Sequence, residues 1–116
     1  MSHFITLQAA VGMTTAFRAA KETVVKDEYR GRNILPVCET FDRSAFDALL
    51  SHPDCTGIRL YSSMDASLML HTIAVGVNIK NEDILPSAVS GRLENDIVEN
   101  SMRCPEDCPP SSPLNI

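Results

Sequence analysis

Two β-prone segments separated by a short linker constrain this chain more than any other feature of its sequence. Residues 58–61 alternate in character along the chain, and β-branched or large side chains dominate residues 68–77. The linker, residues 62–67, is short and turn-forming, so we expect an antiparallel hairpin. A two-stranded hairpin is only marginally stable in water, so further strands or a partner chain must complete the sheet.

The material for completing the sheet is limited. Two segments, residues 33–37 and 83–87, share the tripeptide Ile-Leu-Pro. Proline cannot donate to a strand ladder, so each segment is expected at a sheet edge or as an extended apolar plug. Both faces of residues 68–77 carry apolar side chains, which favours a strand covered on both sides. We therefore expect a homodimer or a larger assembly, in which a partner covers the unpaired edges.

Two helices are predicted before the hairpin. Apolar residues recur at helical spacing from about residue 6 to residue 29, with Thr6 as the N-cap and Gly31 after the end. A second helix begins near Asp42 and ends by about residue 51, because proline follows at position 53. Phe41 and Phe46 flank its start at the spacing of a hydrophobic staple.

These elements predict an α+β fold, with two N-terminal helices packed on a small antiparallel sheet made of the hairpin and the edge segments. The 116 residues fit one domain. We expect residues 1–86 to form its core. Residues 87–116 are expected to form an acidic, proline-rich, extended tail docked on the core or on a partner chain. The predicted core is a single apolar cluster: Phe17, Val24, Phe46, Leu49, Ile58 and Leu60.

Composition excludes several classes of protein. The formal net charge of −5 argues against a sequence-independent nucleic-acid binder, which needs a basic face. No apolar run approaches the roughly 20 residues of a membrane span. The first residues lack the basic and apolar regions of a secretory signal. We therefore expect a cytoplasmic protein, in a compartment where disulfides are rare.

Four cysteines raise the question of metal or redox chemistry. Cys38 and Cys55 stand alone in the sequence and are interpreted as small buried apolar residues. Cys104 and Cys108 are separated by three residues. They could bind a soft metal ion, form a small disulfide loop or only pack against neighbouring side chains. Structural zinc usually needs four ligands, and the other cysteines and histidines are scattered. We favour a packing role and keep metal or redox chemistry as the alternative.

No catalytic or cofactor-binding residue is predicted. His71 lies within a predicted strand and is expected to pair with a carbonyl or carboxylate. Ser62 and Ser63 lack the sequence surroundings of a nucleophile elbow, and no glycine-rich phosphate loop is present.

Several segments resemble a group of small bacterial proteins of unknown function. They are residues 39–46, 58–61 and 75–78, together with the ending in which Cys104 and Cys108 are each followed by proline. The resemblance covers about residues 5–115. It implies a bacterial, cytoplasmic, uncharacterised protein, and it implies no activity, ligand or site residue.

The sequence thus predicts a non-enzymatic module for protein–protein interaction or self-association, with no cofactor and with a protein partner that the sequence does not identify. The alternative is a metal- or redox-responsive module using Cys104 and Cys108. A second alternative is a small-molecule binding domain with a pocket between helices and sheet.

Overall fold

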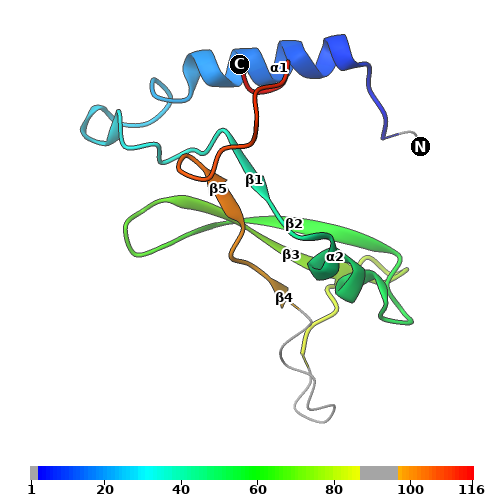
Figure 1. Cartoon of the computed structure of the whole chain (residues 1–116). Coiled ribbons are helices and arrows are strands. Elements are labelled where there is room, and N and C mark those ends of the chain that lie inside the picture. Colours follow the sequence, from blue (N-terminus) through cyan, green and yellow to red (C-terminus); the bar gives the residue numbers. More distant parts are fainter. Residues whose placement is uncertain (1–2, 87–96) are drawn as a thin grey trace. The chain divides into compact units, whose positions relative to one another are not determined.

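The computed structural model of the chain describes residues 3–86 and 97–116 (Figure 1). It contains two α-helices, one short 3-10 helix and antiparallel sheets, so the mixed α+β class is confirmed. The described residues fall into two compact units. One comprises the residues up to Cys38 together with Arg103–Ile116, and the other lies within Glu39–Met102. The predicted boundary between residues 86 and 87 touches residues outside the described part of the chain.

Helix α1 spans Leu7–Ala20 and begins as its sequence predicts. The Thr6 hydroxyl accepts a hydrogen bond from the Ala9 N–H at 3.0 Å, which satisfies one of the unpaired amides of the first turn. The helix ends nine residues earlier than predicted. The residues after Lys21 include the β-branched run Thr23-Val24-Val25, which is poorly suited to helix.

A second cause of the early end is that side chains after α1 hold the following loop. The Lys21 ammonium donates to the Asn33 side chain at 2.8 Å, and the Glu22 carboxylate accepts the Gly31 N–H at 2.7 Å. Gly31 has φ +80°, a left-handed conformation that favours glycine. The chain between them contains only the 3-10 helix Asp27–Tyr29. The prediction of one continuous helix to residue 29 is therefore wrong.

The C-terminal residues of the same unit contact α1. The Arg18 guanidinium donates to the Leu114 carbonyl at 2.5 Å and to the Ile116 carbonyl. Between Ser112 and Asn115 the chain makes a tight turn, closed by the bond from the Asn115 N–H to the Ser112 carbonyl. One arginine thus fastens the last residues to the helix.

Helix α2 spans Arg43–Leu50, close to the predicted bounds. Asp42 occupies the N-cap position with extended backbone, although its side chain makes no capping hydrogen bond. The rings of Phe41 and Phe46 lie 5.5 Å apart, which confirms the predicted pair across the helix start. Leu49 is the buried residue of this helix.

A three-stranded antiparallel sheet follows in the order β2–β3–β4 (Figure 1). Strand β2, Gly57–Met64, pairs with β3, Leu70–Val77, so the predicted hairpin is confirmed. Strand β4, Ile97–Val98, pairs with Ala74 and Val75 of β3. Strand β2 starts one residue before the predicted segment and ends three residues after it, because the turn is made by Asp65 and the residues after it.

A second, two-stranded sheet joins β1, Cys38–Thr40, to β5, Met102–Cys104. The two Ile-Leu-Pro segments are not strands themselves. The first leads into β1, where the Val37 N–H donates to the Cys104 carbonyl at 2.8 Å. The second bridges β3 through the pair Val77 and Asp83. The first segment therefore precedes an edge strand. The second lies along β3 itself, where the Ile84 N–H also donates to the Gly76 carbonyl at 2.8 Å.

The predicted single core cluster is wrong. Leu49 is buried, but the side chains of Val24 and Leu60 are 69% and 61% exposed. Leu60 lies on an outer strand of its sheet. The alternation of residues along a strand does not ensure that another element covers the side chains there. Among the residues that the structure describes, the buried apolar ones are few: Ile34, Leu49, Ala74, Val75 and Cys104. In the described part of the chain, the helices are too short or too polar to cross a bilayer.

Candidate interaction surface

Strand β2 is the outer strand of the three-stranded sheet, and no described residue pairs with its far side. It is eight residues long, whereas β4 on the opposite edge has only two. A long strand with one unpaired side presents a row of free backbone N–H and C=O groups, with which another strand can pair. We define the free edge as the side of β2 that faces away from β3.

The register identifies which backbone groups lie on the free edge. Beyond the end of the strand, the Asp65 N–H donates to the Met69 carbonyl, so residues 65 and 69 are a hydrogen-bonded pair. Such pairs alternate along an antiparallel ladder, and the odd-numbered residues of β2 therefore bond to β3. The even-numbered residues direct their N–H and C=O groups to the free edge: Ile58, Leu60, Ser62 and Met64.

The far edge of β3 is closed by side-chain contacts in the same unit. Beyond β4, the Thr72 N–H donates to the Glu39 carboxylate at 3.1 Å, and the Thr72 hydroxyl donates to its second oxygen at 2.5 Å. The Ser101 hydroxyl also donates to Glu39, at 2.8 Å. A carboxylate thus takes the place of a neighbouring strand there, and no described residue does the same for β2.

The side chains of β2 do little to prevent strand pairing. Leu60 and Met64 are 61% and 56% exposed, although both are apolar. The strand contains no proline and no lysine, which are the residues that commonly protect exposed edges. Its one charged residue, Arg59, is neutralised within the sheet by Asp83. The edge is therefore long, apolar and free of charge repulsion.

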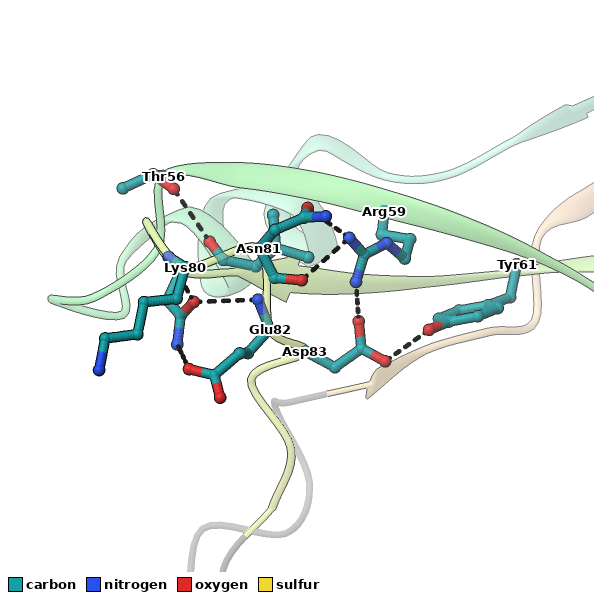
Figure 2. A network of polar contacts seen from close by, with 9 residues as sticks. Thr56, Arg59, Tyr61, Lys80, Asn81, Glu82 and Asp83 are labelled. Carbon is teal, nitrogen blue, oxygen red and sulfur yellow. Dashed lines mark hydrogen bonds and ion pairs between the residues drawn. The ribbon is translucent and has the colours of Figure 1, made fainter.

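Figure 2 shows the polar network that neutralises Arg59. The Arg59 guanidinium donates to the Asp83 carboxylate at 2.5 Å, and the Tyr61 hydroxyl donates to its other oxygen at 2.5 Å. Arg59 also donates to the backbone carbonyl and the side chain of Asn81. The two β2 residues lie on one face of the sheet, so they fasten the segment after β3 across the hairpin.

A tight turn presents Asn81 and Asp83 to this network. The Asn78 side-chain oxygen accepts the N–H groups of Lys80 and Glu82 at 2.9 and 3.0 Å. Asn81 adopts a left-handed conformation with φ 64°, which asparagine tolerates better than most residues. The turn reverses the chain, and the Asn78 N–H bonds back to the Glu82 carbonyl. The hydrogen bonds of this turn therefore place the Asp83 carboxylate beside the Arg59 guanidinium.

The electrostatics of the network indicate a structural clamp. The hydrogen bond from Tyr61 and the nearby Arg59 lower the pKa of the Asp83 carboxyl. The same hydrogen bond to Asp83 raises the pKa of the Tyr61 hydroxyl. Tyr61 therefore acts as the hydrogen-bond donor to Asp83 in this network.

His71 lies near the turn of the hairpin, where it contacts the Asp65 carboxylate. Its Nε2 atom is 2.8 Å from the Asp65 carboxylate, which confirms the pairing predicted for this residue. Asp65 also accepts the N–H groups of Ser67 and Met69, and the Met69 bond is the main cause of its lowered pKa. The pair closes the turn between β2 and β3.

The structure joins Cys104 and Cys108 in a disulfide. Their sulfur atoms are bonded to each other, so they do not act as metal ligands in this state. The described residues contain no group of three or more histidine, cysteine or acidic residues that could hold a metal. Cys38 and Cys55 are free and half-buried. The Cys55 thiol donates to the Gly57 carbonyl at 3.2 Å.

A shallow cavity of about 450 Å³ lies beside α2 and β4, and it is open to solvent. Its described lining combines small side chains of the helix, including Ala45 and Ala48, with the acidic residues Asp42 and Glu99. It contains none of the residues of the polar network. The free edge of β2 therefore remains the more distinctive surface.

Sequence reasoning missed both the free edge and the polar network. The edge follows from strand order, and Arg59 and Asp83 are 24 residues apart, with no local pattern to link them.

No family model, no curated protein and no solved structure matches this chain. The resemblance to small bacterial proteins of unknown function therefore stays a prediction.

Proposed function

We propose that this protein is a non-enzymatic self-association module in which the free edge of β2 pairs with the same strand of a second copy. The observation that carries the proposal is the eight-residue edge strand β2, whose side away from β3 pairs with no described residue and which has exposed apolar side chains. Pairing two such strands antiparallel about a two-fold axis joins two three-stranded sheets into one of six strands. Main-chain hydrogen bonds then supply affinity, as in other cases of strand addition.

One alignment of the two β2 strands pairs every backbone N–H and C=O group that lies on the free edge. If the two-fold axis passes beside Tyr61, Ile58 faces Met64 of the second copy and Leu60 faces Ser62. Both are then hydrogen-bonded pairs, and no N–H or C=O group of these four residues is left unpaired. A shift of the register in either direction leaves some of these groups without partners.

The charges favour a second copy of this chain as the partner. In the register centred on Tyr61, Arg59 faces Ser63 of the second copy, so the like charges of the two strands do not oppose each other. Met64, which is exposed in the single chain, faces Ile58 of the second copy, and the exposed Leu60 lies diagonally across from Leu60 and Met64 of that copy. Self-pairing thus buries the apolar edge without burying an unpaired charge.

The finer arrangement of the chain is part of the same proposal. We place α2 against the three-stranded sheet, and the proline-rich end in an extended path along its own unit. The contacts of Arg18 with Leu114 and Ile116 support such docking at the C-terminal end. The same proposal includes a bacterial source and a cytoplasmic location, both of which the sequence predicts.

Light scattering coupled to size exclusion tests the proposal. We expect a mass of about twice 12.7 kDa at micromolar concentration. The mass should fall toward that of one chain on dilution, because a single strand pair forms a modest interface. A mass of 12.7 kDa at every concentration up to about 1 mM, a range set by weak association, would contradict the proposal.

A further inference from the structure

The two cysteines of the disulfide differ in their exposure to solvent. Cys104 ends strand β5 and is only 5% exposed, whereas Cys108 belongs to the exposed loop that follows. The loop is short, with Pro105, Glu106 and Asp107 between the cysteines. A reductant that approaches from solvent therefore meets the Cys108 sulfur first.

We propose that the Cys104–Cys108 disulfide is a reversible thiol–disulfide exchange site that a dithiol reductant opens at Cys108. This inference does not depend on self-association through β2. A thiolate of the reductant attacks the Cys108 sulfur, and the bond between Cys108 and Cys104 breaks. The Cys104 thiolate leaves and takes up a proton. The reductant is now joined to Cys108 in a mixed disulfide, and its second thiol attacks its first sulfur. This closes a disulfide within the reductant and releases the Cys108 thiolate, which takes up a proton, so two electrons and two protons pass to the protein.

The buried cysteine is well placed to act as the leaving sulfur and as the group that restores the disulfide. The Cys104 carbonyl accepts the Val37 N–H, and the neighbouring Arg103 donates to the Asn33 and Ile34 carbonyls at 2.6 and 2.7 Å. These bonds do not involve the disulfide, so Cys104 keeps its position after reduction. Cys108 remains four residues away and can close the bond again.

Reduction is expected to loosen the residues beyond the loop. The loop has two backbone hydrogen bonds of its own, from the Asp107 N–H to the Arg103 carbonyl and from the Cys108 N–H to the Glu106 carbonyl. Among the described residues, the hydrogen bonds that join the C-terminal residues to α1 are the pair from Arg18. Disulfides in a cytoplasmic protein are usually transient or redox-sensing, which fits a bond of this kind.

Thiol counting and adduct mapping on the full chain test this inference. The oxidised protein should show two free thiols in denaturant, from Cys38 and Cys55, and four after native treatment with dithiothreitol. Removal of the reductant and addition of oxidised glutathione should restore a count of two. When glutathione replaces the dithiol, peptide mapping should find at least ten times more adduct on Cys108 than on Cys104.

The matched control is the double variant Cys104→Ser, Cys108→Ser, which imitates the reduced state. Amide exchange over residues 109–116 should be at least ten times faster both in this variant and in the reduced native chain, while β2 and β3 keep their protection. Four free thiols before any reductant is added would overturn the inference. So would reduction that needs denaturant, an adduct mainly on Cys104, or unchanged exchange in the C-terminal residues.

Discussion

Replacing Ser62 by proline is expected to convert the dimer largely into single chains of 12.7 kDa while leaving the hairpin folded. The Ser62 N–H points to the free edge, so proline removes no bond between β2 and β3. In the dimer each copy loses one hydrogen bond. Two bonds at about 1 kcal/mol each raise the dissociation constant about 30-fold before the clash of the ring is counted. Sedimentation equilibrium measures the change.

Ser63→Pro is the matched control, because the Ser63 N–H belongs to the ladder with His71. This variant should lose strand signal in circular dichroism, since a proline there removes a bond inside the sheet. If Ser62→Pro associates as tightly as the native chain while it keeps its strand signal, the free edge is not the interface. If the two prolines have equal effects on folding, the assignment of outward-facing residues is wrong.

Truncating Leu49 to alanine is expected to lower the free energy of unfolding by about 3 kcal/mol, within the usual range for a buried leucine. Leu49 is 3% exposed, and its helix packs on the three-stranded sheet. The sheet and α2 bury few other side chains, so little else can compensate for the cavity. Urea denaturation followed by circular dichroism gives the change in free energy.

Leu50→Ala provides the comparison, because Leu50 is the next residue of α2 and is 52% exposed. We expect a change of about 0.5 kcal/mol or less, as is usual for surface positions. A loss below about 1 kcal/mol for Leu49→Ala, which is too small for a buried leucine, would show that α2 does not seal the core. Equal losses for the two variants would lead to the same conclusion.

The elements that the sequence predicted are those encoded by local signals. The alternation of residues 58–61 and the turn before residue 68 indicated the hairpin, and Asp42 with the Phe41–Phe46 pair marked the start of α2. Helix α1 began at Thr6 for the same reason. Its end was mispredicted because helical spacing continues past Ala20, while Glu22 bonds to the distant loop at Gly31.

The parts that sequence reasoning missed depend on long-range placement. Whether β2 is an outer or an inner strand depends on β4, which contributes only two residues and gives no local pattern. The Glu39 carboxylate meets Thr72 across 33 residues of chain. The pairing of Cys104 and Cys108 was one of several open alternatives, because spacing alone does not distinguish a disulfide from metal ligation.

The self-pairing of β2 about Tyr61 is tested most directly by cross-linking at that residue, in a chain with Cys38→Ala and Cys55→Ala. The two Tyr61 residues would be a non-hydrogen-bonded pair with Cα atoms about 4.5 Å apart, close enough for a disulfide. The two Ser63 residues would lie about 14 Å apart along the strands, which is too far. We predict that oxidised Tyr61→Cys becomes a covalent dimer and that Ser63→Cys does not. A covalent dimer from Ser63→Cys alone, or from neither variant, would contradict the proposed interface.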